Sequence, residues 1–336
     1  MAPFELGIDT FGDVTVDDTG RTLSQAESLR HVIDEAVLAD DVGIDAFGVG
    51  EHHRADFSVS APEVVLAAIA GRTRRITLGS AVTVLSTDDP IRVFQRFSTL
   101  NALSNGRAEV IVGRGSFTES YPLFGYDLAD YERLFEDKLA RFAQLLKPGN
   151  GGVFPPIEHG TLRTWVGVGG SPESVVRAAR YALPLTLAII GGSPLRFRPY
   201  VDLYLESLQR FGHGAQPIAV HSPGHVADTD QQAKDELWPH YAAMMTRIGA
   251  ERGWPPATRA GFEREASPDG ALCVGSPDTV AAKIIRTVKA LGLSRFDMKY
   301  SAGTLPHASL MKSIRLFGTA VAPQVRSAVG RPATHV

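Results

Sequence analysis

Short apolar segments alternate with amphipathic segments along almost the whole chain. Apolar residues at helical spacing, as between Leu23 and Asp41, predict helices, and short apolar runs such as Phe4–Asp9 predict buried strands. The pattern predicts eight strands, at residues 4–9, 46–50, 75–85, 107–113, 165–169, 185–190, 218–221 and 295–300. It predicts helices at residues 23–41, 63–70, 91–103, 131–146, 172–181, 195–211, 231–252, 279–291 and 308–320.

Regular alternation of strands and helices indicates an α/β fold with a parallel sheet, and eight such repeats are typical of a closed TIM (β/α)8 barrel. A barrel needs about 250 residues, so we expect the rest of the 336 residues to form insertions, at 147–163 and 253–270. No linker-like tract divides the chain, which predicts a single domain over residues 1–336. An open doubly wound sheet is disfavoured because no strand–turn–helix unit carries a dinucleotide-binding GxGxxG motif followed by a ribose-binding acid.

Composition limits the location and partners of the protein. Apolar residues make up 44% and charged residues 21%, as in ordinary globular enzymes. The net charge of −3 is dispersed, which argues against a nucleic-acid surface. Cys273 is the single cysteine, so no internal disulfide can form. The N-terminus lacks signal-peptide features, and no apolar run reaches the ~20 residues of a membrane span. We therefore expect a cytoplasmic protein that binds neither membranes nor nucleic acid.

The active site of such a barrel lies at the C-terminal ends of the strands. After the fifth predicted strand, residues 169–174 (GGSPES) lead directly into a helix. Glycines let the backbone approach a ligand, and the N–H groups and dipole at a helix N-terminus favour phosphate. Gly170 would contribute backbone, and Ser171 and Ser174 hydroxyls. An ordinary helix cap with a tight turn explains the same residues equally well.

Arg114 favours the phosphate interpretation. It lies between two glycines after the fourth predicted strand, which neighbours the fifth in a barrel. Its guanidinium could form charge-assisted hydrogen bonds to the same phosphate, worth roughly 1.5–3 kcal/mol. The alternative is a surface ion pair with Glu119 or Asp137.

A Glu51-His52-His53 sequence follows the second predicted strand. Adjacent side chains on a strand point to opposite faces, and a catalytic metal requires three protein ligands, so a metal site is disfavoured. A histidine at the barrel mouth can act as a general acid or base, because its ordinary pKa of about 6.5 suits proton transfer. His52 is the candidate, and a hydrogen-bonded structural histidine is the alternative.

Other residues give weaker indications. Gly191 and the glycine after it either make room for a flat ring or form a simple turn. His221 and His225 could line the substrate side, or could be structural. Cys273 lies in an apolar run, which is more typical of a small buried side chain than of a nucleophile.

A set of motifs, in order along the chain, resembles the luciferase-like flavin-dependent monooxygenases. The matching stretches are Gly43–Phe47 through Glu51–His53, Leu78–Val82, Asp89–Arg92, Leu103–Arg107, Val112–Gly115, Phe124–Gly125 and Gly170–Ser174. The resemblance implies a TIM barrel that binds flavin mononucleotide (FMN) and uses reduced FMN and O2 to oxidise a small organic substrate. No nicotinamide site is evident, so a separate flavin reductase would supply the reduced FMN. A homodimer through residues 63–70 and 91–103 is also implied.

The resemblance also implies roles for individual residues. Arg114 would bind the FMN phosphate, with Gly170, Ser171 and Ser174, and His52 matches the family's catalytic histidine. The Ala81–Val82 bond matches a place where the family often has a cis peptide beside the flavin ring, and Gly191 could make room for that ring.

Two positions depart from the family pattern, and two other functions stay open. The reactive cysteine of the luciferases is replaced by Gly113, and an acidic residue before the phosphate-binding serine is replaced by Gly170. The first leaves the reactivity of the flavin open. The alternatives are a hydride-transferring oxidoreductase that uses a deazaflavin, and a protein that binds flavin without turnover.

Overall fold

The protein is described here by a computed structural model covering residues 4–17, 19–149 and 152–330. Eight parallel strands close into a barrel, because β10 pairs with β1 on one side and with β8 on the other. The barrel strands are β1 (Glu5–Thr10), β2 (Ala46–Val49), β3 (Thr77–Ser80), β5 (Ala108–Gly113), β6 (Arg163–Val168), β7 (Leu185–Ala188), β8 (Ile218–Val226) and β10 (Arg295–Lys299). Two short strands, β4 (Thr83–Val84) and β9 (Cys273–Gly275), pair with β5 and β8. The predicted TIM barrel is confirmed.

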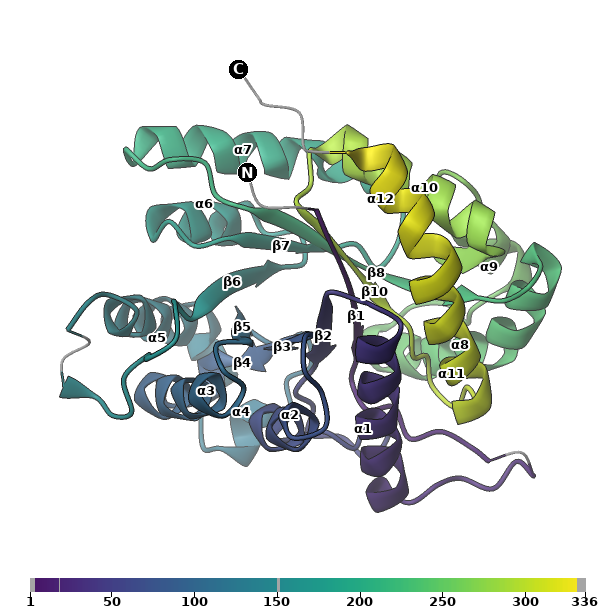
Figure 1. Ribbon diagram of the computed structural model, residues 1–336, viewed down its shortest axis with the longest axis horizontal. Coiled ribbons are helices and arrows are strands. Elements are labelled where there is room, and N and C mark those ends of the chain that lie inside the picture. Colours follow the sequence, from purple (N-terminus) through teal and green to yellow (C-terminus); the bar gives the residue numbers. More distant parts are fainter. Residues whose placement is uncertain (1–3, 18, 150–151, 331–336) are drawn as a thin grey trace.

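Helices surround the barrel on its outside (Figure 1). They are α1 (Gln25–Asp41), α2 (Pro62–Ala70), α3 (Pro90–Leu103), α4 (Ser120–Leu123), α5 (Tyr131–Leu145), α6 (Pro172–Arg180), α7 (Arg198–Arg210), α8 (Asp230–Arg252), α9 (Arg259–Ala266), α10 (Pro277–Leu291), α11 (His307–Leu316) and α12 (Ala322–Val329). Local sequence explains where several begin. The Ser24 hydroxyl accepts from the Glu27 N–H and Glu27 bonds back to the Ser24 N–H, forming a capping box at α1. Asp89 is the N-cap residue of α3, and Pro90 is the first residue of that helix.

Several predicted boundaries were wrong in detail. The strand expected at 75–85 is two strands, β3 and β4, and the peptide bond between Ala81 and Val82 that separates them is cis. The strand expected to end at His221 continues to Val226. The insertion at 253–270 contains α9, and the helix expected at 308–320 is α11 followed by a π-helical turn and α12.

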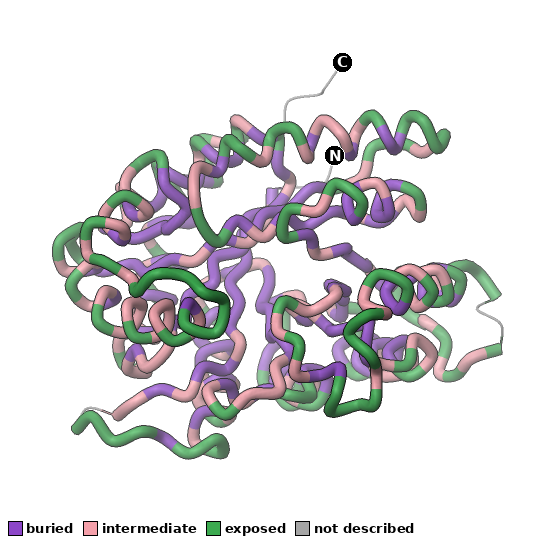
Figure 2. The backbone as a smooth tube through the Cα atoms, turned by 180° about the vertical axis from the view of Figure 1, so that it is seen from behind, coloured by how far each residue is buried: buried purple, intermediate pink, exposed green. Residues whose placement is uncertain are grey.

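The core has two parts of different chemistry. Apolar side chains fill the layer between strands and helices, and Figure 2 shows the strands buried while the helices alternate between buried and exposed residues. Inside the barrel the apolar cluster is small, with Ile111, Trp165 and Ala219. Barrel interiors are usually packed with branched aliphatic residues, so this interior is unusual.

Ion pairs occupy the floor of the barrel. Arg295 is only 3% exposed and pairs with Glu109 and, at 2.7 Å, with Asp297. Arg163 bonds Glu109 at 2.7 Å and Glu5 at 2.8 Å. Burial raises the pKa of Asp297 to about 6, although Arg295 opposes this rise. Removing one member of such a buried pair destabilises the folded protein by roughly 3–5 kcal/mol, because the other charge is left buried and unpaired.

Candidate active site

A cavity of about 570 Å3 opens at the C-terminal ends of the barrel strands, above the ionic floor. This volume is within the range of about 300–1,000 Å3 that is usual for small-molecule sites. Residues from β1, β2, β8 and β10 and from the segments after β3, β5, β6 and β7 line it. The cavity therefore lies where barrel enzymes place their chemistry.

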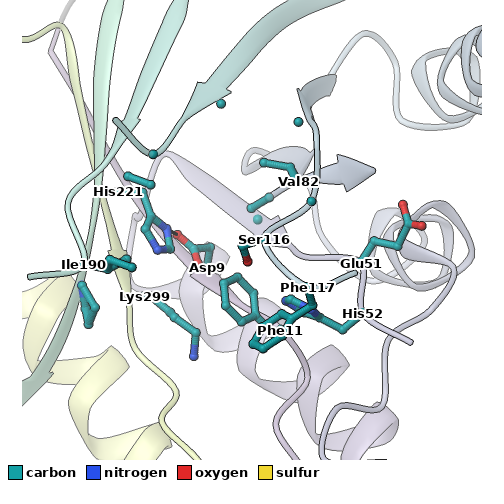
Figure 3. Close-up of a pocket in the computed structure, with 18 of the residues that line it drawn as sticks. Asp9, Phe11, Glu51, His52, Val82, Ser116, Phe117, Ile190, His221 and Lys299 are labelled. Carbon is teal, nitrogen blue, oxygen red and sulfur yellow. Dashed lines mark hydrogen bonds and ion pairs between the residues drawn. The ribbon is translucent and has the colours of Figure 1, made fainter. Parts of the chain in front are cut away.

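His52 lines this cavity (Figure 3). Its ring centroid lies 4.5 Å from that of Phe11, 4.5 Å from that of Phe57 and 5.2 Å from that of Phe117. Burial among these rings lowers the pKa of His52 to about 3. The expectation of an ordinary histidine pKa was therefore wrong, and the imidazole is neutral at pH 7.

His53 also lines the cavity, contrary to the expectation that it leaves the strand on the opposite face. The reason is that β2 ends at Val49, so the alternation of a strand does not extend to residues 52 and 53. His53 Nε2 lies 2.9 Å from Oε1 of Glu51, whose other oxygen accepts the Val84 N–H at 2.8 Å. Glu51 thus connects the segment after β2 to β4.

Small residues hold Ala81 and Val82 against the cavity. A Cβ added to Gly48 would lie 2.9 Å from the Ala81 Cβ, and one added to Gly113 would lie 2.7 Å from Cγ2 of Val82. Real Cβ atoms essentially never come so close, so both positions require glycine unless Ala81 and Val82 shift. Gly113, which stands where the resemblance expects a cysteine, therefore allows Val82 to lie this close to the end of β5.

Arg114 and the start of α6 form another part of the cavity wall. Arg114, Gly169, Gly170 and Ser171 line the cavity. The Arg114 guanidinium lies 4.9 Å from the ring centroid of Tyr131 and forms an ion pair with Glu132, not with the residues expected. Its side chain is 20% exposed, so it is accessible to a ligand.

Two predicted ligands lie outside the cavity lining. Ser174 is buried in the first turn of α6, where its Oγ accepts from Arg177 at 3.4 Å. Gly191 is exposed beyond β7, and the neighbouring Gly192 N–H donates to Glu265 at 2.9 Å. The structure therefore brings together His52, Ala81, Val82, Arg114, Gly170 and Ser171, but not Ser174 or Gly191.

The two histidines of β8, His221 and His225, lie in different surroundings. His221 lines the cavity, and its Nδ1 lies 2.8 Å from Oδ2 of Asp9. His225 is fully buried outside the cavity lining, and its Nε2 lies 2.8 Å from Glu236. Asp9 was missed by the sequence analysis, since a single acidic residue at the end of a strand carries no motif.

Cys273 is buried in β9, and burial raises the pKa of its thiol to about 11, as expected for an unreactive side chain.

Ion pairs connect the C-terminal end of α8 to loops at the cavity mouth. Arg54, which follows β2, pairs with Glu251 of α8 at 2.9 Å between Nη1 and Oε2, and also pairs with Glu119. Arg247 of α8 bonds Asp56 at 2.6 Å. These contacts hold α8 against the loops after β2 and β5.

Comparison with known proteins identifies the family. The sequence profile of the luciferase-like monooxygenases matches residues 10–295. The chain belongs to this family. It is 27% identical over 330 residues to 4-hydroxyprotoasukamycin monooxygenase of Streptomyces nodosus. This match covers 88% of this chain and 87% of that protein. It is 25% identical over 240 residues to the alkanal monooxygenase alpha chain of Photorhabdus luminescens, covering 66% of this chain and just under two thirds (65%) of that protein.

Solved structures share the fold at low sequence identity. Monooxygenase RslO1 of Streptomyces bottropensis superposes with a TM-score of 0.79 at 21% identity, over 95% of this chain and 99% of that chain. The oxygenating constituent of 3,6-diketocamphane monooxygenase of Pseudomonas putida, in complex with FMN, gives a TM-score of 0.75 at 20% identity, over 96% and 99%. A coenzyme F420-dependent tetrahydromethanopterin reductase of Methanopyrus kandleri gives 0.68 at 18%, over 96% and 100%.

Two further findings concern the described residues only. They contain no group of three or more histidine, cysteine, aspartate or glutamate side chains arranged to hold a metal ion. None of their helices combines the length and the apolar character needed to cross a bilayer.

The residues of the cavity fit a flavin nucleotide. The lining is mainly apolar beside Ala81 and Val82, as a flat ring system requires. Gly170, with φ of +128°, has open space where a Cβ would stand, apart from the Tyr200 hydroxyl at 3.8 Å. The backbone at the start of α6 is therefore accessible, and Arg114 supplies a cation nearby.

Proposed function

We propose that this protein is a monooxygenase that takes reduced FMN from a separate reductase and uses O2 to oxidise a small organic substrate. The observation that carries the proposal is the shared cavity of Arg114, the α6 N-terminus, the Ala81–Val82 segment and His52. Family membership supports it, and so does the likeness to an FMN-containing monooxygenase.

Each part of the cavity has a role in this proposal. Arg114 and the backbone at Gly170 and Ser171 hold the phosphate, and the wall at Ala81 and Val82 supports the ring. Bound reduced flavin supplies the electrons for oxygen activation. His52 stays neutral, so one of its ring nitrogens can donate a hydrogen bond and the other can accept one beside the flavin ring.

A second candidate cofactor is a deazaflavin, which would make the protein a hydride-transferring oxidoreductase. The structural likeness to a coenzyme F420-dependent reductase supports a deazaflavin as this second candidate. Nothing in the phosphate-binding residues alone distinguishes the two, because both cofactors carry a phosphate after the ribityl chain.

A fluorescence titration with FMN, riboflavin and coenzyme F420 tests the proposal. We expect FMN to bind more tightly than riboflavin, because only FMN offers a phosphate to Arg114, and more tightly than F420. Rapid mixing of the reduced FMN complex with O2 should then give reoxidation kinetics that differ from those of free FMN. Preferential binding of F420 would favour hydride transfer, and FMN reoxidation at the rate of free FMN would favour a protein that binds flavin without turnover.

A further inference from the structure

A second histidine faces the cavity from the wall opposite His52 (Figure 3). His221 belongs to β8, and its ring lies nearly parallel to that of Phe11, at 9° and 6.1 Å. Its Nδ1 lies 2.8 Å from Oδ2 of Asp9, a side chain at the end of β1 that is 2% exposed. This bond fixes the orientation of the ring, as a carboxylate partner does for a catalytic histidine.

One further polar atom on each residue of this pair lacks a hydrogen-bond partner in the part of the chain that the structure describes. Among the described residues, no hydrogen bond reaches Nε2 of His221, and Oδ1 of Asp9 is buried without a partner. The only hydrogen bond from these residues to the Asp9 carboxylate comes from His221. Because Oδ1 of Asp9 is buried, Nε2 of His221 is the polar atom of the pair that a ligand in the cavity can reach.

The charges around His221 favour its protonated form. The charged groups that face it are Asp9 from β1 and Lys299 and Asp297 from β10, while β7 contributes Ala188 beside it. Burial lowers the pKa of His221, but the Asp9 carboxylate outweighs this effect and the pKa is raised above its ordinary value. The pKa of His52 is lowered instead, so the pKa values of the two cavity histidines are shifted in opposite directions.

The wider ionic network leads to the same conclusion. It contains more carboxylates than permanent cations, so a proton on His221 reduces an excess of negative charge. The carboxylates are Glu5, Asp9, Asp13, Glu109 and Asp297, and the permanent cations are Arg163, Arg295 and Lys299.

We propose that His221, oriented through Nδ1 by Asp9, donates a hydrogen bond from Nε2 to an oxygen atom of the substrate. Substrates of this cavity therefore combine an apolar body with a carbonyl or carboxylate oxygen. The proposal rests on the proposed oxidation in the same cavity, and it divides the work between two histidines. His52 serves the flavin side as a neutral group, and His221 recognises the substrate, with Asp9 as a positioning residue.

Binding of three matched compounds tests this recognition. Acetophenone, α-methylstyrene and benzoate share a phenyl body and differ in a carbonyl, a methylene or a carboxylate group. Calorimetric titrations of the full chain, with and without saturating FMN, should show acetophenone or benzoate binding roughly tenfold to hundredfold more tightly than α-methylstyrene. The stronger of the two identifies the neutral or the anionic oxygen as the preferred group. Equal binding of all three compounds would overturn the proposal.

Matched variants assign the preference to a residue. In His221→Leu the three compounds should bind about equally, whereas His52→Leu and His213→Leu should keep the preference. His213 follows α7 and lies outside the cavity lining. Loss of the preference in His52→Leu and its retention in His221→Leu would contradict the assignment. None of these titrations needs a bound flavin or turnover, so the recognition can fail while FMN binding succeeds, and the reverse.

A histidine titration by NMR tests the pair without removing His221. In the wild-type chain the His221 resonance should titrate above about 6.5, the ordinary value for histidine. In Asp9→Asn the titration should move to lower pH, because burial then acts without the carboxylate charge. A purely structural Asp9–His221 contact would leave compound selectivity intact in this variant. A wild-type titration at or below the ordinary value, unchanged in Asp9→Asn, would also contradict the proposal.

Discussion

Arg114 connects the sequence motif to the proposed cofactor. It is 20% exposed, lies on the cavity wall, and shares Glu132 with Arg177 through ion pairs. We expect Arg114→Ala to raise the dissociation constant of FMN roughly tenfold or more, because a charge-assisted bond to the phosphate is lost. Fluorescence titration should give an unchanged constant for riboflavin, which lacks the phosphate.

A control variant separates this effect from a general loss of positive charge near α5. Arg133 pairs with Asp130 and Asp137 on the exposed side of α5 and does not line the cavity. Arg133→Ala should therefore bind FMN like the wild type. If Arg114→Ala weakens FMN and riboflavin by the same factor, the arginine supports the local structure and does not bind the phosphate.

His52 should matter for turnover more than for cofactor affinity. Removal of a preorganised hydrogen-bonding group beside the reacting atoms typically lowers the rate roughly 10²- to 10³-fold, so His52→Ala should lower single-turnover oxidation by a factor in this range while FMN affinity changes little. His53 is not a suitable control, because it also lines the cavity and pairs with Glu51. His213→Ala is the better comparison.

The pH profile gives a second measure of the same assignment. Since the pKa of His52 is about 3, its charge does not change between about pH 5 and 8. Loss of activity as pH rises through the raised pKa of His221 is expected instead. A transition in this range that disappears in His52→Ala and persists in His221→Gln would contradict both roles.

At the scale of elements, local pattern predicted the barrel but not its irregular strands. Eight alternating segments were sufficient for the fold, since the periodicity of strands and helices is a local property. The strand predicted to end at His221 continues through Pro223 and Gly224 as part of β8. A Cβ at Gly224 would lie 2.6 Å from Sδ of Met298 and 2.7 Å from the Cys273 carbonyl oxygen, so glycine permits the close approach of β9 and β10. Such long-range pairing leaves no local signal.

The same distinction applies to the site. Gly170, Ser171 and Arg114 lie beside strand ends in short motifs, and their placement on the cavity wall followed from the barrel. Ser174 belongs to the same motif as Gly170 and Ser171, and Gly191 follows the next predicted strand. Neither reaches the cavity wall, because Ser174 is buried in the first turn of α6 and Gly191 lies in an exposed loop. The Asp9–His221 pair spans 212 positions of sequence, and only the closure of β1 and β8 around β10 brings it together.

At the scale of the whole molecule, the surface of α2 and α3 is the candidate for self-association. Val64 of α2 is 69% exposed and Leu103 at the end of α3 is 64% exposed. Phe154, 70% exposed, belongs to a segment held to α3 by a 3.0 Å hydrogen bond from the Gln95 side chain to the Phe154 carbonyl oxygen. Exposed large apolar side chains can mark a protein interface, so a homodimer through the surface of α2 and α3 stays our prediction.

Light scattering at micromolar concentration should give twice the chain mass of 36.1 kDa. The double variant Val64→Glu and Leu103→Glu should shift the mass toward one chain, because burying two unpaired carboxylates at an interface costs several kcal/mol. Phe211→Glu is the matched control: Phe211 is 38% exposed at the end of α7, which Figure 1 places on the side of the barrel away from α2. It should leave the mass unchanged. A monomer mass for the wild type, or equal effects of the two variants, would exclude this interface and leave each cavity to function within one chain.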